Sequence, residues 1–249
     1  MPDHHQEQLI MCPLAQIFAS LCRTPQRWTL HRILKSANTQ DIQGNLHGTA
    51  TFTPLRTQTS NAHSKRHPDP EPDPDVDRSA DMVYREEGTM PSTVGVGVGV
   101  GLRFTKKYIW RMSDTGGISV WFAKVQGTKI QDDEEPEPEP DYLFHEFVLD
   151  EPSSSSSREK WKDNEKEPLI VEAPIPPREN SNNDRLSTSS STTVVRARGN
   201  HLCINDMYHT AYAFRIRRES GEVVSWSSRH VVKGPKKDQD IVNLYWLGE

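Results

Sequence analysis

The residues best suited to chemistry lie in the segment NHLCINDMY, residues 200–208. His201 and Cys203 are two positions apart, so in a strand both side chains project from the same face. Asp206 and Tyr208 follow after a predicted turn. An imidazole, a thiol, a carboxylate and a phenol held together can bind a metal, activate a thiolate, or form a buried hydrogen-bond network. The segment alone leaves all three open.

Metal binding has little support, because zinc normally takes three or four protein ligands and the segment offers only His201 and Cys203. A third ligand would have to come from elsewhere in the chain, such as His145 or His230. We therefore predict no metal and no cofactor.

As an enzyme, the chain would be of hydrolase or isomerase type, with His201 as the base beside Cys203 or Asp206. No G-x-S-x-G nucleophile motif is present, so the sequence favours a binding protein over an enzyme. As a binding protein, the chain would hold a small, partly apolar ligand inside the barrel. The polar anchors of the ligand would be His201, Tyr108, Glu86 and Lys237, and aromatic side chains would form the walls of the binding site. The predicted ligand contacts are Trp28, Tyr84, Glu86, Tyr108, Trp110, Phe122, His145, His201, Tyr208, Trp226 and Lys237.

The composition limits the classes of partner. Among 249 residues, 30 are Lys or Arg and 35 are Asp or Glu, and the resulting net charge of −5 argues against nucleic-acid binding. The run GVGVGVG at 95–101 precedes a predicted strand rather than a helix, so it is not a phosphate-binding loop. The sequence contains no run of about 20 apolar residues, so we predict no membrane span. Three scattered cysteines indicate a reducing compartment, and we expect an intracellular, cytoplasmic protein. The sequence does not predict the oligomeric state.

Three segments contain almost nothing to bury: residues 57–81, 131–141 and 151–193. They are rich in proline, acidic residues and serine, which is typical of solvated, disordered loops. The chain is thus expected to comprise an N-terminal segment, 1–25, with a short helix near 14–22, and one domain over 26–249 that carries these insertions. If the loops recruit partners, the domain would instead be a scaffold.

The rest of the chain reads as nine or ten short strands with hairpin turns between them. Their predicted ranges are 26–34, 45–52, 83–87, 102–110, 118–125, 143–149, 194–204, 207–216, 223–232 and 241–247. A sheet of consecutive antiparallel strands must protect the unpaired edges of its outermost strands, and closing the sheet into a barrel is the simplest way to do so. We therefore predict an all-β, antiparallel up-and-down barrel, with a β-sandwich as the alternative.

An ordered series of short motifs resembles a known family. The motifs are RW-x-L-x-R at 27–32, G-x-A-x-F at 48–52, Y-x-E-x-G at 84–88, Y-x-W at 108–110, V-x-F at 120–122, FH at 144–145, H-x-C-x-x-D-x-Y at 201–208 and, after Trp226, V-x-GP-x-KD at 232–238. They resemble the bacterial and fungal domain of unknown function number sixty-three-fourteen, over every strand and none of the insertions. The resemblance implies a small, calycin-like barrel similar to lipocalins and fatty-acid-binding proteins, whose cavities take apolar ligands; it implies no particular activity.

Overall fold

The computed structural model of the chain describes residues 12–23, 26–55, 81–90, 102–124, 137–150, 169–178 and 191–248. Within these ranges the chain forms one helix and ten strands. Their bounds are α1 (Pro13–Arg23), β1 (Arg27–Ser36), β2 (Gly44–Pro54), β3 (Met82–Thr89), β4 (Arg103–Met112), β5 (Ile118–Ala123), β6 (Pro140–Leu149), β7 (Thr192–Cys203), β8 (Asp206–Arg217), β9 (Val223–Lys233) and β10 (Asp238–Leu247).

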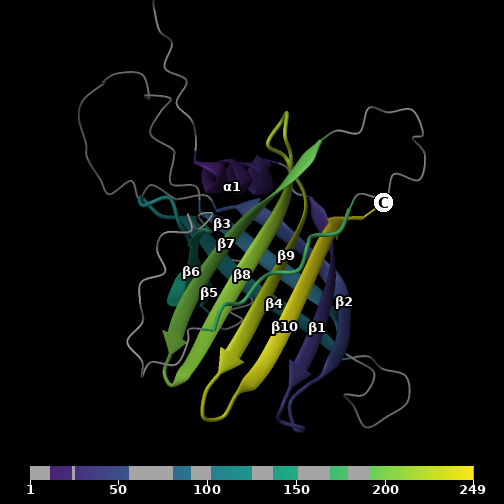
Figure 1. Cartoon of the computed structure of the whole chain (residues 1–249), viewed down its shortest axis with the longest axis vertical. Helices are drawn as coiled ribbons and strands as arrows, with labels where there is room; N and C mark the ends of the chain where they lie inside the picture. The colour runs from purple at the N-terminus through teal and green to yellow at the C-terminus, as the bar shows by residue number, and fades with distance from the viewer. Residues whose placement is uncertain are drawn as a thin grey trace, which may run out of the picture.

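The ten strands form a closed barrel in which each strand pairs antiparallel with its neighbours in the chain (Figure 1). β1 closes the ring by pairing with β10, from Trp28 opposite Leu247 to Ser36 opposite Gln239. This confirms the predicted up-and-down barrel and excludes the β-sandwich. The lipocalin-like outline is consistent with this topology.

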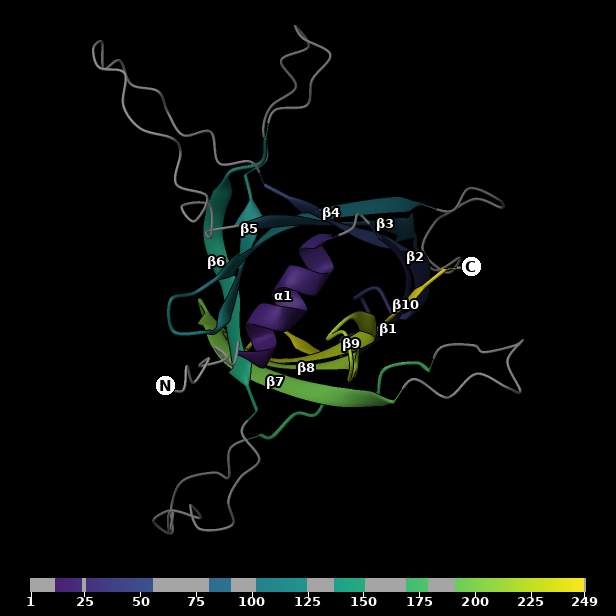
Figure 2. The same ribbon diagram turned by 90° about the horizontal axis from the view of Figure 1, so that it is seen from above.

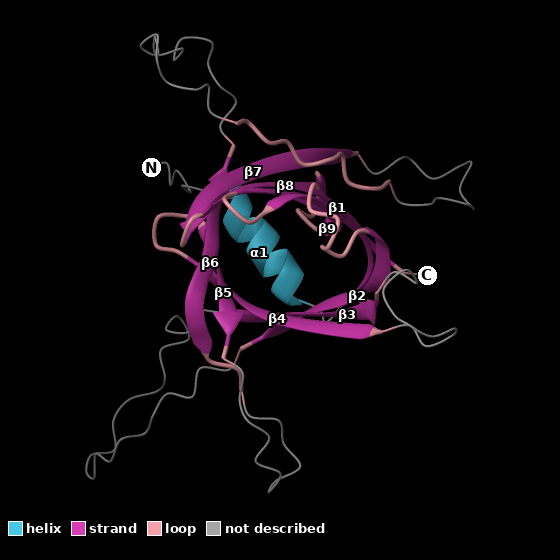
Figure 3. Ribbon diagram, turned by 90° about the horizontal axis from the view of Figure 1, so that it is seen from below, coloured by secondary structure: helices cyan, strands magenta, loops and turns pink. Residues whose placement is uncertain are grey.

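Helix α1 lies across one end of the barrel, as the views along the barrel show (Figures 2 and 3). Leu14, Ile17, Phe18 and Leu21 recur at helical spacing and are all buried, so one apolar stripe of α1 packs into the barrel core. Its Ser20 hydroxyl accepts a hydrogen bond of 2.9 Å from the backbone N–H of Val223. The helix therefore closes this end, and the β1–β2, β7–β8 and β9–β10 turns form the opposite end, called the mouth below.

Two glycines allow β2, β3 and β4 to approach closely. Gly48 and Gly88 are opposite each other in the β2–β3 pairing. A Cβ atom on Gly88 would lie 2.4 Å from the backbone oxygen of His47 and 2.9 Å from Cε1 of Phe104. Since backbone cannot yield as a flexible side chain does, this position requires glycine.

We expect Gly88→Ala to lower the free energy of unfolding by about 1–3 kcal/mol, the usual cost of forcing an extra methyl group into a packed site. Urea denaturation monitored by tryptophan fluorescence measures the change. Gly248→Ala is the matched control, because the nearest neighbour of its Cβ would be the Thr29 hydroxyl at 3.2 Å, beyond the last strand. Equal stability of the two variants would contradict the steric argument.

The pairing is uneven around the ring. Strands β7 and β8 pair from Thr192 to Cys203, whereas only Val148 and Leu149 of β6 find partners on β7. Near this junction a Cβ on Gly199 would lie 1.7 Å from the backbone oxygen of Glu146, so the two strands also meet closely there. The β6–β7 junction is thus the least paired of the barrel.

Part of the third predicted insertion has a defined place. Residues 169–178 run over the outer face of the barrel (Figure 1). Ala173 is 5% exposed and packs against Ala211 and Ala213 of β8. The Arg215 guanidinium donates hydrogen bonds to the backbone oxygens of Pro176 and Pro177, at 3.0 and 3.2 Å. A proline-rich segment cannot pair as a strand, but its carbonyl groups still accept hydrogen bonds.

This placement differs from the solvated loop expected over 151–193; residues 151–168 and 179–190 lie outside the described residues. The first insertion, 57–81, lies outside them except for Asp81. In the second, 131–141, β6 already begins at Pro140, so the predicted boundary was too late. The GVGVGVG run at 95–101 is also outside the described residues.

Candidate ligand-binding site

A cavity of about 340 Å³ lies inside the barrel, between the core packed on α1 and the mouth. Ile42, Met90 and Ile241 line its outer part, at or near turns of the mouth. Every one of these side chains is apolar, and most of the cavity wall is apolar as well.

Aromatic rings form the inner wall of the cavity. Trp226 of β9 and Tyr245 of β10 stack in parallel, with ring centroids 3.5 Å apart. Trp110 of β4 meets Trp226 nearly at a right angle, at 6.0 Å. Tyr84 and Tyr108 continue the wall on the side of β3 and β4. Interlocked rings of this kind give a rigid wall that suits a flat or apolar molecule.

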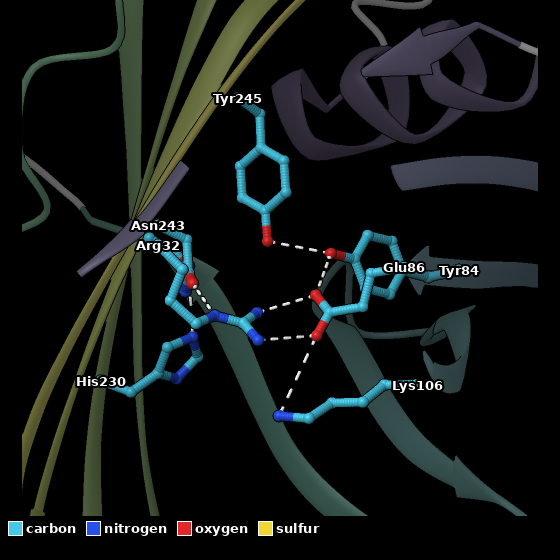
Figure 4. A network of polar contacts seen from close by, with 8 residues as sticks. Arg32, Tyr84, Glu86, Lys106, His230, Asn243 and Tyr245 are labelled. Atoms are coloured by element: carbon cyan, nitrogen blue, oxygen red, sulfur yellow. Dashed lines mark hydrogen bonds and ion pairs between the residues drawn. The ribbon is translucent and has the colours of Figure 1, made fainter. Parts of the chain in front are cut away.

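One side of the cavity holds a buried network of polar side chains (Figure 4). Both terminal nitrogens of the Arg32 guanidinium donate to the Glu86 carboxylate, at 2.7 Å each, and its Nε donates to Asn243 at 2.5 Å. The Tyr84 hydroxyl donates to Glu86 at 2.7 Å and lies 2.9 Å from the Tyr245 hydroxyl. A bidentate arginine–carboxylate pair is among the strongest polar contacts in proteins.

Lys106 of β4 adds a second positive charge beside this pair. Its Nζ lies 3.9 Å from Glu86 Oε1, and its side chain is 49% exposed whereas that of Glu86 is 1% exposed. Burial opposes ionisation of Glu86, but the charges of Arg32 and Lys106 outweigh burial and hold the pKa of the carboxyl below its ordinary value. The group of three therefore carries one more positive than negative charge.

Two histidines line the cavity next to this network. His145 Nε2 lies 2.7 Å from the Tyr212 hydroxyl, and His230 Nε2 lies 3.2 Å from the Ser228 hydroxyl. Burial lowers the pKa of His230 to about 3, with Arg32 contributing, and lowers that of His145 far below the ordinary value. Both rings are therefore neutral at neutral pH. Neither Nδ1 atom has a hydrogen-bond partner in the described part of the chain.

A β-bulge brings two consecutive side chains of β6 to the cavity. Residue Val120 of β5 is opposite His145, and Trp121 is opposite Leu143, so the register shifts at Phe144. In a regular strand Phe144 and His145 would face opposite sides, yet both line the cavity. Bulges commonly redirect a side chain in this way near functional sites.

The structure brings seven of the eleven predicted ligand contacts to the cavity wall: Tyr84, Glu86, Tyr108, Trp110, His145, Tyr208 and Trp226. The other four lie elsewhere. Trp28 is buried in the core beside α1, and Phe122 stacks on Tyr142. His201 does not line the cavity, and Lys237 lies 3.0 Å from the Tyr208 hydroxyl and 3.4 Å from Asp206.

The four groups that opened the sequence argument lie on one face of the β7–β8 hairpin, with His201 opposite Tyr208 and Cys203 opposite Asp206. Asp206 forms its ion pair with Lys237. Within the described residues no hydrogen bond joins His201 to Cys203 or Asp206, and no group of three or more potential ligands is placed to hold a metal ion. The three cysteines are unpaired.

Several cavity residues were missed by sequence reasoning: Arg32, Lys106, Tyr212, Ser228, His230, Asn243 and Tyr245 as ligand contacts. The alternation of β1 and β4 held a signal. Arg32 follows Trp28 and Leu30 at two-residue spacing, and Lys106 stands between Phe104 and Tyr108 in the same way. A charged residue in the inward register of a barrel indicates a buried polar site.

No described helix is long and apolar enough to cross a membrane. No curated protein and no solved structure matches the chain. A family model described as a family of unknown function (DUF6314) matches residues 25–165 and 180–246. These ranges run through the first two predicted insertions and both ends of the third, and leave out the whole of the ordered outer segment, residues 169–178. The match covers every strand of the barrel, and the chain therefore belongs to this family of unknown function.

Proposed function

We propose that the protein binds a small, partly apolar molecule inside the barrel. The observation that carries the proposal is the 340 Å³ cavity, which combines aromatic walls with a buried polar network on one side. Small-molecule sites are typically concave, mostly apolar, and provided with a few placed polar groups. A barrel that served only as a scaffold would be expected to fill this space with side chains.

The cavity volume limits the size of the ligand. Since a water molecule takes up roughly 30 Å³ of liquid, the space corresponds to about eleven waters. A ligand of about a dozen non-hydrogen atoms fits this volume, and a large macrocycle such as haem does not. The aromatic wall of Trp110 and Trp226 would report binding through its fluorescence.

The test is a thermal-shift and fluorescence screen of the full chain with medium-chain fatty acids and alcohols and with small aromatic metabolites. Ile241→Trp should block the cavity, because Ile241 lines its outer part. Val242→Trp is the matched control, since the next residue on β10 does not line the cavity. We expect at least one compound to bind wild type and Val242→Trp and to lose about tenfold or more in affinity for Ile241→Trp. The proposal is overturned if no compound binds, or if Ile241→Trp binds as well as wild type.

A further inference from the structure

Among the described residues, the buried side-chain atoms of the cavity wall that lack a hydrogen-bond partner are ring nitrogens of His145, His230 and Trp226. Both oxygens of Glu86 accept hydrogen bonds from Arg32, and one of them also accepts from Tyr84. Because the Tyr84 proton goes to Glu86, the Tyr84 oxygen accepts from Tyr245. Glu86 thus accepts three hydrogen bonds and the Tyr84 oxygen one, so most of the acceptor capacity of this network is used within it.

A second series of hydrogen bonds runs from Arg32 through Asn243 and Ser228 to His230. Its proton positions follow from Arg32, which can only donate. The Arg32 Nε–H can only donate, so Asn243 presents its oxygen to Arg32 and its NH₂ group to the Ser228 hydroxyl, at 2.8 Å. Ser228, which accepts from Asn243, still has its own proton to donate, and His230 Nε2 is the acceptor within reach. A neutral His230 that accepts at Nε2 carries its proton on Nδ1, the atom without a partner.

The same reasoning applies to His145. The Tyr212 hydroxyl is buried, and its contact within the described residues is His145 Nε2 at 2.7 Å. The phenol is the stronger acid of the two, so it donates its proton to the ring nitrogen. His145 therefore also carries its proton on an unpartnered Nδ1. The rings of His145 and His230 are 5.5 Å apart between centroids.

Lys106 completes this set of donors. Its ammonium group lies 3.9 Å from Glu86, beyond hydrogen-bond distance, and it makes no hydrogen bond to any described residue. It also contributes to the positive potential at His230. The residues of the cavity wall thus include two imidazole N–H groups and the indole N–H of Trp226, all buried and without a partner among the described residues, and one ammonium group, with an excess of one positive charge.

We infer that the ligand is a small monocarboxylate with an apolar body, whose carboxylate is held by Lys106 and by the Nδ1–H groups of His230 and His145. This inference rests on the proposed function, since it names the ligand class of the same cavity. Both Nδ1 atoms are shielded from water, and the Phe144 ring lies 4.6 Å from His145 and 6.3 Å from His230 between centroids. The inference therefore includes a rotation of the Phe144 ring that opens the two imidazoles to the carboxylate.

Three probes that share the same apolar part test which head group the cavity prefers: cinnamate, cinnamyl alcohol and cinnamylamine. Each fits the cavity volume, and they differ in carrying an anionic, a neutral or a cationic head. We expect isothermal titration at neutral pH to show cinnamate binding at least tenfold more tightly than the alcohol and the amine not binding measurably.

The variant Lys106→Gln removes the charge at a partly exposed position and so should leave the fold intact. It should reduce cinnamate affinity about tenfold and leave the affinity for cinnamyl alcohol unchanged. Lys107→Gln, the next residue on β4, does not line the cavity and is the matched control. An equal loss for both probes in Lys106→Gln would show a structural effect and overturn the inference.

The imidazole donors have a direct signature in nitrogen NMR. In the full chain at neutral pH, both histidines should show the Nδ1–H tautomer, and cinnamate should shift their Nδ1 signals. Nε2–H tautomers, or tighter binding of the alcohol or amine than of cinnamate, would overturn the inference while the proposed function stands. Absence of binding by all three probes, together with a screen in which no compound binds, would overturn both.

Discussion

Replacing Glu86 by glutamine should lower the free energy of unfolding by about 3–5 kcal/mol. The substitution keeps the shape of the side chain but removes the counter-charge of Arg32, which is buried inside the barrel. It also leaves Arg32 and Lys106 as two positive charges without an acid between them. Chemical denaturation with global fitting of the unfolding curve measures the loss.

Two variants show whether charge pairing is the cause. Glu87→Gln affects the neighbouring, partly exposed carboxylate, which pairs with Arg27 at 3.4 Å, and should cost no more than about 1 kcal/mol. The double variant Arg32→Met with Glu86→Leu removes both charges and should recover most of the stability lost in Glu86→Gln. If the double variant is as unstable as the single one, the loss comes from packing and the electrostatic explanation fails.

Acidification should destabilise the protein already between pH 6.5 and pH 5, before ordinary carboxyl groups titrate. The unfolded chain binds protons on His145 and His230 near pH 6.5, whereas burial in the barrel keeps both neutral, with the pKa of His230 lowered to about 3. The unfolded state thus binds more protons in this range, and stability falls with decreasing pH. The slope should reach up to about 1.4 kcal/mol per pH unit for each histidine.

Urea denaturation at half-unit pH intervals gives this slope. Glu86 acts in a lower window: its pKa is depressed in the folded barrel, so its contribution is lost only as pH falls below about 4.5. His230→Phe should remove one histidine contribution and flatten the curve above pH 5 while leaving the lower window in place. A variant that keeps the wild-type slope would show that other groups control the acid response.

Alternation along the strands was enough to predict the barrel, because the strand period is two and hairpins favour antiparallel neighbours. The aromatic wall followed from the same rule, since Tyr84, Trp110 and Trp226 occupy inward positions. Glu86 was found through its place beside Tyr84, although its partner Arg32 was not. That pairing joins β1 and β3 across β2 and depends on how far these strands are shifted along one another, because alternation fixes only the face of each side chain and a shift of two residues keeps that face.

Two features depend on more than periodicity. A strictly alternating β6 would separate Phe144 and His145, and only the register shift against β5 places both in the cavity. The outer segment 169–178 is apolar at five of its ten positions, unlike the charged and serine-rich stretches around it, and it packs where small outward residues of β8, such as Ala211 and Ala213, leave room for Ala173. Neither the register shift of β6 nor the packing of Ala173 on β8 can be seen in the sequence of the segment alone.

The sparse pairing of β6 with β7 makes that junction the point of least cooperativity in the barrel. Local openings start where the fewest backbone hydrogen bonds must be broken, so β6 is the strand that separates from its neighbour at the lowest free energy. The same strand carries Phe144 and His145. Fluctuations of the barrel wall are therefore concentrated at β6 with His145, while His230 lies on β9, which pairs along its length with both β8 and β10.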